Sequence, residues 1–114
     1  MSRILIHDGT VAVLLDKVIL AETTSERMRG LLGRDSLPAD TGMLIRPCSS
    51  IHMWFMRFPI DVAFLDREMR VLKISRNVRP WQLAFAPEKT YCVLETAAGV
   101  LAPVEPGVGL EIVD

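Results

Sequence analysis

Most residues of the run Ile51–Asp66, IHMWFMRFPIDVAFLD, are apolar, yet the run contains a histidine, an arginine and an aspartate. A glutamate stands in a similar setting in the later segment VLETA. Because an ionised group removed from water needs hydrogen-bond donors or a counter-charge, these are the side chains that could do chemistry. A tryptophan ring in the same run could stack on a sugar or a base. The candidate ligand-binding residues are therefore His52, Trp54, Arg57, Asp61 and Glu95.

Two roles are open to Asp61, one structural and one functional. Side chains alternate between the faces of a strand, and residues 60–65 are apolar on both faces apart from Asp61, which predicts a strand covered on both sides. The carboxylate then caps backbone N–H groups or pairs with an arginine, or it orients a ligand or acts as a base. Arg57 can reach it only if the chain bends, and Pro59 favours such a bend and splits the run into two strands. The same alternatives hold for Glu95, either a solvated strand end or part of a site with Asp61.

No catalytic or cofactor motif accompanies these residues. The chain lacks the G-x-S-x-G, H-E-x-x-H, P-loop and Cys/His patterns. A soft-metal site is disfavoured, because strand parity directs Met53 away from His52 and Met56, and methionine is a common core filler. We expect no metal and no cofactor. A hydrolase with Asp61 and Glu95 as general acid and base remains as the enzymatic alternative, although the absence of a motif favours a protein that is not an enzyme.

The length and charge of the chain argue against several classes of protein. Its 114 residues, half of them apolar, predict one domain over residues 1–114 with a core of its own. Thirteen basic and fourteen acidic residues give no electrostatic footprint for nucleic acid or an anionic membrane. Without a signal-peptide pattern or a long apolar span, a cytoplasmic location is expected. Cys48 and Cys92 form no C-x-x-C pair and are interpreted as small buried hydrophobes. The oligomeric state stays open.

The elements that position these side chains are mostly short strands. Apolar runs around Asp8-Gly9 predict a hairpin. An antiparallel meander is expected from three short strands at residues 3–7, 10–15 and 18–21. Further strands are expected at residues 43–46, 51–57, 60–65, 71–78, 90–95 and 110–113, with a hairpin turn at 66–68. The predicted fold is mainly β, a compact antiparallel β-barrel or sandwich with one short α-helix at about residues 24–32 and at most one helical turn near 97–102.

The predicted helix begins with a capping box formed by Thr23 and Glu26. Arg27, Arg29 and Arg34 follow close to two glycines, an arrangement that invites phosphate binding. Because the P-loop spacing is absent, a solvated basic face is the favoured interpretation.

The run at residues 51–66 looks like the signature of the prokaryotic domain-of-unknown-function family 192. Upstream, RMRGLLGR at 27–34 and GMLI at 42–45 resemble the Arg-x-x-Gly-Leu and Gly-Met-Leu elements of the family, and VLETAAG at 93–99 resembles its Leu-Glu-x-x-x-Gly element. The resemblance covers residues 23–109 and implies a compact β-rich single domain with no established reaction. Many relatives carry an export or lipoprotein signal, which this sequence does not show, and the C-terminal VGLEI lacks their Gly-Asp.

Three functions remain in order of preference. The first is a small β-rich binding module for a polar small molecule or a sugar, with its site around Asp61. The second is a protein-interaction or structural module, whose sign would be an exposed patch of Trp54, Phe55 and Phe58. The third is the hydrolase described above.

Overall fold

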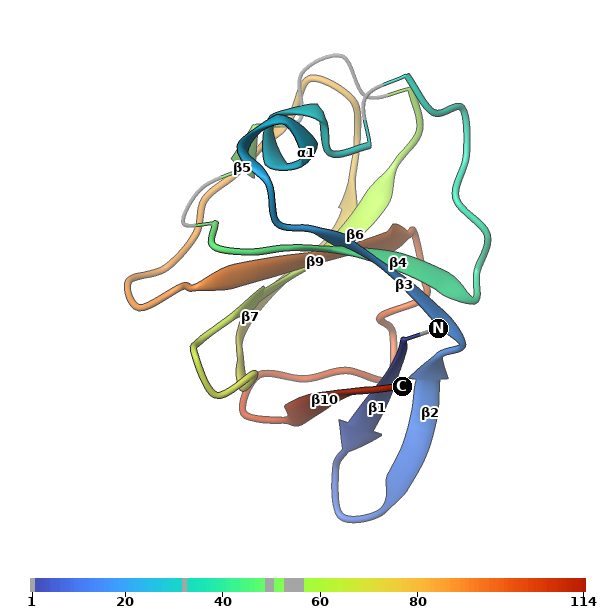
Figure 1. The fold of residues 1–114 in the computed structure, drawn as a ribbon, viewed down its shortest axis with the longest axis vertical. Coiled ribbons are helices and arrows are strands. Elements are labelled where there is room, and N and C mark those ends of the chain that lie inside the picture. Colours follow the sequence, from blue (N-terminus) through green and yellow to red (C-terminus); the bar gives the residue numbers. More distant parts are fainter. Residues whose placement is uncertain (1, 32, 49–50, 53–56) are drawn as a thin grey trace.

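The computed structural model describes residues 2–31, 33–48, 51–52 and 57–114, which form short strands and one short helix (Figure 1). In chain order these are β1 (Arg3–His7), β2 (Val11–Leu15), β3 (Lys17–Ala21), α1 (Thr24–Arg29), β4 (Thr41–Ile45), β5 (Ile51–His52), β6 (Ile60–Leu65), β7 (Val71–Val78), β8 (Leu83–Ala84), β9 (Cys92–Ala97) and β10 (Gly109–Val113). The expectation of a mainly β protein with one short helix is confirmed.

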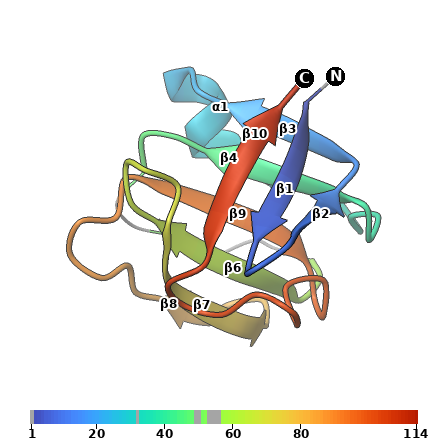
Figure 2. The same cartoon turned by 90° about the horizontal axis from the view of Figure 1, so that it is seen from below.

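Two sheets build a sandwich-like body. The larger has the strand order β3-β4-β9-β6-β7, the smaller has the order β10-β1-β2, and β5 pairs with β8 in a separate short ribbon. Figure 1 shows α1 on one side of the larger sheet and the smaller sheet on the other. Figure 2 shows β10, β1 and β2 lying across β4, β9 and β6. The larger sheet is therefore covered on both faces, as its strands without a polar face require.

A separate core lies on each face of the larger sheet. The helix-side core contains Ala21, Leu31, Leu37, Met43, Ile45, Ile60, Val62, Phe64, Val78, Ala84 and Val93. The sheet-side core contains Ile4, Ile6, Leu15, Val18, Leu44, Ala63, Leu65, Val71, Cys92, Leu94, Leu101, Val104 and Leu110. Alternation along β9, with Val93 on the helix side and Leu94 on the sheet side, shows how one strand supplies both cores.

The Asp8-Gly9 hairpin forms as predicted, but the third strand of the predicted meander does not continue it. β1 and β2 pair antiparallel with His7 opposite Val11. β3 instead pairs with β4, parallel, with Lys17 opposite Thr41. The expectation that residues 18–21 continue an antiparallel meander is thus wrong. Parallel neighbours need a long crossover, and α1 with the loop after it provides that connection.

Two other predicted elements also differ from the structure. α1 ends at Arg29 because Gly30 leaves the helix with a positive φ of 49°. Residues 98–103 form successive turns and no helix, held by bonds such as the one from the Val100 N–H to the Ala97 carbonyl, 3.2 Å. Of the strand predicted at 51–57, the described part is β5, while residues 53–56 lie outside the described ranges.

Strands distant in sequence close the smaller sheet. β1 lies between β10 and β2, with Arg3 opposite Val113, and the two marked chain ends lie side by side in Figure 2. The Ser2 hydroxyl donates a hydrogen bond to the Asp114 carboxylate at 2.6 Å. The sheet-side core is therefore capped by strands from both ends of the described chain.

Candidate ligand-binding site

Asp61 is a buried carboxylate whose oxygens all have backbone donors. Its Oδ1 accepts the N–H of Asn77 at 2.9 Å, and its Oδ2 accepts the N–H groups of Gly99 at 2.9 Å and Leu101 at 3.1 Å. Only 1% of the residue is exposed. Three N–H bonds on a buried carboxylate satisfy it without a counter-ion. This arrangement agrees with the structural alternative, in which Asp61 joins the end of β7 to the turns after β9.

Arg57 does not meet Asp61. Its guanidinium Nη1 lies 2.8 Å from Oδ1 of Asp35, in an exposed ion pair. The break at Pro59 is confirmed, since β5 and β6 are separate strands. It does not bring the two charged groups together, because Asp61 turns toward Asn77, Gly99 and Leu101 instead.

Two further candidate ligand-binding residues, His52 and Trp54, lie partly or wholly outside the described residues. The backbone of His52 belongs to β5, where it pairs with Leu83 of β8, while its side chain is not described. Trp54 lies outside the described residues, as do Met53 and Met56 of the soft-metal alternative. Within the described ranges, no three His, Cys, Asp or Glu residues are grouped as a metal site would require.

Glu95, like Asp61, is a buried carboxyl residue of the larger sheet. It lies in β9 opposite Met43 of β4 and Val62 of β6, and it is 3% exposed. Burial raises the pKa of Glu95 from 4.5 to about 7, because the charged form loses its hydration. The alternative of a solvated strand end is therefore wrong.

Asp61 and Glu95 point to opposite faces of the larger sheet. Asp61 pairs in register with Thr96, and Glu95 pairs with Val62. Side chains alternate along a strand, so Glu95 shares the face of Val93 and the helix-side core, whereas Asp61 shares the face of Ala63 and the sheet-side core. The sheet itself separates the two carboxyls, and the geometry does not form the acid and base pair of the hydrolase alternative.

A pocket of about 380 Å³ lies between α1, the turn after it and the edge of the larger sheet. We call it the helix pocket. Its lining residues are Ile19, Leu20, Ala21, Glu26, Arg29, Gly30, Gly33, Arg34 and Met43. A second, more open pocket of about 240 Å³ is lined by Pro47, Cys48, Thr90 and Tyr91, none of them charged. Of these two pockets, both formed by described residues, the helix pocket combines apolar walls with charged groups.

The Glu95 carboxyl lies next to Gly30, a lining residue of the helix pocket, although Glu95 is not itself among the lining residues. A Cβ atom built on Gly30 would stand 3.9 Å from Glu95 Oε1 and 3.8 Å from Ile45 Cδ1. Gly30 and Met43, which is the register partner of Glu95, both line the pocket. The carboxyl therefore lies behind the pocket wall with no side chain at position 30 in between.

The charged groups of the helix pocket lie at its mouth. Arg29 and Arg34 are exposed, and within the part of the chain that the structure describes neither guanidinium has a hydrogen bond or an ion pair. Glu26 is engaged elsewhere, since its Oε1 accepts the N–H of Thr23 at 3.0 Å and that of Glu22 at 3.2 Å. These backbone bonds, that of Thr23 first, lower the pKa of Glu26. The predicted capping box is confirmed.

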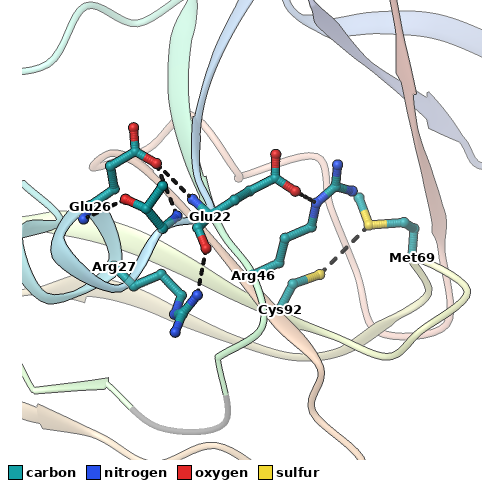
Figure 3. A network of polar contacts seen from close by, with 7 residues as sticks. Glu22, Glu26, Arg27, Arg46, Met69 and Cys92 are labelled. Atoms are coloured by element: carbon teal, nitrogen blue, oxygen red, sulfur yellow. Dashed lines mark hydrogen bonds and ion pairs between the residues drawn. The ribbon is translucent and has the colours of Figure 1, made fainter.

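Polar contacts fix α1 above the sheet (Figure 3). The side chain of Glu22, just before the helix, pairs with Nε of Arg46 at 2.9 Å, and Arg46 directly follows β4. Arg27 donates to the Glu22 carbonyl. A helix of six residues is not stable alone, so these bonds and the packing of Leu31 in the helix-side core hold it in place.

Cys92 behaves as the sequence predicts, a small buried hydrophobe. It lies in the sheet-side core with its Sγ 3.6 Å from Sδ of Met69 (Figure 3). Burial raises the pKa of the Cys92 thiol to about 11. Cys48 is half-buried. A thiol that stays protonated is a poor nucleophile, so Cys92 has no place in a reactive site.

Sequence reasoning passed over Arg29 and Arg34, which it assigned to a solvated basic face. Both are indeed exposed, but they also line the helix pocket. The signal that pointed to them was the cluster of arginines next to Gly30 and Gly33. The sequence does not show that the turn at Gly30 faces β3 and β4, and this contact is what gives the two arginines a pocket to line.

The fold and the pocket define a small β-rich domain of sandwich type, with a single described helix over one sheet face. No helix within the described residues is long and apolar enough to cross a membrane. The chain belongs to domain-of-unknown-function family 192, described as "Uncharacterized ACR", whose family model matches residues 4–112. The resemblance noted in the sequence is thereby confirmed.

Known relatives are similar in sequence and in fold. A UPF0127 protein of Thermococcus sibiricus is 34% identical over 104 residues, which are 84% of this chain and 64% of that protein, so the chain spans less than two thirds of that relative. A crystal structure of a protein of unknown function from Novosphingobium aromaticivorans superposes with a TM-score of 0.84 at 26% identity, covering 96% of this chain and 83% of the other. A Sinorhizobium meliloti protein, provisionally described as a transcription regulator, gives 0.78 at 28% identity, covering 96% and 92%.

Proposed function

We propose that this protein is a binding module for a small polar molecule that occupies the helix pocket. The observation that carries the proposal is a pocket of about 380 Å³ whose lining combines apolar side chains with two exposed arginines, Arg29 and Arg34. The volume falls within the range of roughly 300 to 1,000 Å³ that is typical of small-molecule sites. The proposed site is therefore the pocket beside α1, whereas the Asp61 carboxyl is held by three backbone donors.

The composition of the pocket favours binding over catalysis. Its walls include the apolar side chains of Ile19, Ala21 and Met43, which can bury the carbon skeleton of a ligand. Arg29 and Arg34 present charged donors suited to a carboxylate or phosphate group. Glu26 is already held by the capping box, so no second carboxyl is available there as a partner for Glu95.

The test is a screen of small polar molecules by nuclear magnetic resonance on uniformly ¹⁵N-labelled protein. We expect binders to shift the amide signals of Ala21, Gly30 and Gly33, and to lose affinity in the double variant Arg29→Gln/Arg34→Gln. Arg3→Gln, on the exposed side of β1, is the matched control for loss of a positive charge. Binders that shift signals elsewhere, or that bind the double variant as well as the wild type, would contradict the proposal.

A second candidate function is protein interaction. Trp81 and Phe85, which flank β8, are 64% and 68% exposed, and large exposed aromatic side chains are typical of interfaces. Phe58, expected in such a patch, is half-buried against the helix-side core instead, while Trp54 and Phe55 lie outside the described residues. Sedimentation velocity of the wild type and of Trp81→Ser/Phe85→Ser would test self-association, and equal monomer behaviour of both at high concentration would refute it.

A further inference from the structure

β3 is an edge strand of the larger sheet, since it stands at one end of the order β3-β4-β9-β6-β7. Its bonds to the β4 segment show which backbone groups point inward. The Lys17 N–H donates to the Asp40 carbonyl, and the Ala21 carbonyl accepts the N–H of Arg46. Backbone groups alternate in direction along a strand, so those of Ile19 also point to β4, and those of the two residues in between point out of the sheet.

The outward-pointing groups belong to Val18 and Leu20. The Val18 N–H donates to the Ser2 carbonyl at 3.0 Å. Within the described part of the chain, the outward N–H and C=O of Leu20 make no hydrogen bond. The next outward N–H, that of Glu22, is taken by Oε1 of Glu26 at 3.2 Å. At Leu20 the sheet edge therefore offers one donor and one acceptor to a partner.

The open edge at Leu20 borders the helix pocket. Leu20 is a lining residue, although its side chain packs against the sheet-side core on the other face of the sheet. The side chains of Ile19 and Ala21 face the helix and supply apolar wall. Because side chains alternate between faces, the backbone of Leu20 is the part of this residue that the pocket meets.

The charged side chains that line the pocket sum to one positive charge. Arg29 and Arg34 contribute two guanidinium groups, and Glu26 contributes one carboxylate. Neither guanidinium has a partner among the described residues, whereas Oε1 of Glu26 is held by the capping box. The two arginines thus suit a single carboxylate, which a guanidinium binds through parallel hydrogen bonds.

We propose that the helix pocket takes a molecule with a carboxylate, an amide and an apolar side chain on one carbon atom, the chemistry of an acylated amino acid or of a peptide's C-terminal residue. Arg29 and Arg34 bind the carboxylate. The amide N–H donates to the Leu20 carbonyl, and the Leu20 N–H donates to the carboxylate, as two residues of an antiparallel pair exchange their bonds. The apolar side chain lies against Ile19 and Met43. This inference rests on the proposed function and names its ligand class.

The pocket and the sheet edge both limit the ligand to this size. A volume of about 380 Å³ corresponds to roughly a dozen water molecules at their share of the liquid volume, and acetyl-leucine has about a dozen non-hydrogen atoms. A longer peptide paired in this way would run toward Glu22, whose N–H is held by Glu26 and whose carbonyl is held by Arg27. Residues beyond the last one therefore gain no further bond to the edge.

The test compares acetyl-leucine with two probes that each lack one group. 4-Methylpentanoate lacks the amide, and acetyl-leucinamide lacks the charge. Affinities are measured from the amide shifts of Gly30 and Gly33. We expect the wild type to bind acetyl-leucine about fivefold more tightly than 4-methylpentanoate, since one net hydrogen bond supplies about this factor, and about tenfold or more tightly than acetyl-leucinamide. In Arg29→Gln/Arg34→Gln the second preference is expected to disappear, while the control Arg3→Gln keeps it.

Amide hydrogen exchange tests the sheet edge directly. Saturation with acetyl-leucine is expected to slow the exchange of the Leu20 N–H, whereas that of Ile19, which already points to β4, stays the same and serves as the control. Acetyl-glycyl-glycyl-leucine separates the two sources of this chemistry. Equal affinity, the expected result, assigns the pocket to a free acylated amino acid, and tighter binding assigns it to a peptide end.

Other results overturn the inference. Equal affinity of the wild type for acetyl-leucine and 4-methylpentanoate, or an unchanged exchange rate at Leu20, removes the edge of β3 from binding and leaves the proposed function intact. Absence of binding by every probe also overturns the ligand class, and the wider screen then decides on the proposed function separately. If the double arginine variant lost its dispersed amide spectrum, the probe comparison and the exchange of Leu20 in the wild type would still decide.

Discussion

Replacing Glu95 by glutamine is expected to remove a pH dependence from the stability of this protein. Burial raises the pKa of Glu95 from 4.5 to about 7 in the folded state. Below about pH 4.5 the carboxyl is protonated in both states and its titration does not affect folding. Between pH 4.5 and 7 the unfolded chain releases the proton first, which stabilises the unfolded state. Above pH 7 both states are ionised and the penalty is constant.

The size of this penalty follows from the same two pKa values. One pKa unit corresponds to about 1.4 kcal/mol, so the difference of about 2.5 gives about 3 kcal/mol of lost stability above pH 7. This is a large fraction of the roughly 5–15 kcal/mol that is typical of a small domain. The glutamine side chain does not titrate, and its own burial penalty is the same at every pH.

Urea denaturation at a series of pH values between about 4 and 8 measures this effect. The free energy of unfolding of the wild type is expected to fall by about 3 kcal/mol relative to that of Glu95→Gln as the pH rises. Glu88→Gln, an exposed position, controls for the loss of a surface carboxylate. Parallel curves for the wild type and Glu95→Gln over the whole range would refute the raised pKa of Glu95 in the folded state.

Three further predictions concern the scaffold, and each is measured by urea denaturation. Asp61→Asn replaces one acceptor oxygen by an N–H₂ group that faces backbone donors, so the free energy of unfolding is expected to fall by about 2–4 kcal/mol. The exposed control Asp35→Asn is expected to lose less than about 1 kcal/mol. Equal losses would argue against the structural role of Asp61. Gly42→Ala places a Cβ 2.6 Å from a Leu15 methyl group and is expected to lower the free energy of unfolding by about 1–3 kcal/mol. In the control Gly109→Ala the nearest neighbour of the new Cβ is 4.0 Å away, so stability is expected to change by less than about 0.5 kcal/mol. The opposite order would show that the core near Gly42 adapts. Thr23→Ala removes the capping box and is expected to lose about 1 kcal/mol, and an unchanged stability would mean that α1 is held by its packing alone.

Local patterns in the sequence predict the local parts of the fold. The Asp8-Gly9 hairpin, the capping box of Thr23 and Glu26, and the break at Pro59 each depend on a few neighbouring residues, and all three are confirmed. The parallel pairing of β3 with β4 depends instead on the path of the crossover between them, which no residue pattern specifies.

The candidate site was harder to predict because its contacts are long-range. The donors to Asp61 come from Asn77, Gly99 and Leu101, 16 to 40 residues further along the chain. The burial of Glu95 depends on α1 and the turn at Gly30, which cover its face of the sheet. The sequence marks both carboxyls as unusual, and only the tertiary structure shows that three backbone donors bind Asp61 while burial raises the pKa of Glu95.

The smaller sheet sets an order on the folding of the chain. β1 pairs on one edge with β2, which follows it directly in the chain. Its other edge pairs with β10, where Val113 lies opposite Arg3 although the two are 110 residues apart in the sequence. During synthesis on the ribosome, the apolar side chains of Ile4 and Ile6 therefore remain uncovered on that side until the last described strand has emerged. Such distant pairing slows folding, because the loop must close before the contact stabilises it. A chain rearranged to make β10 just before β1, through a short linker, is expected to reach the same fold faster.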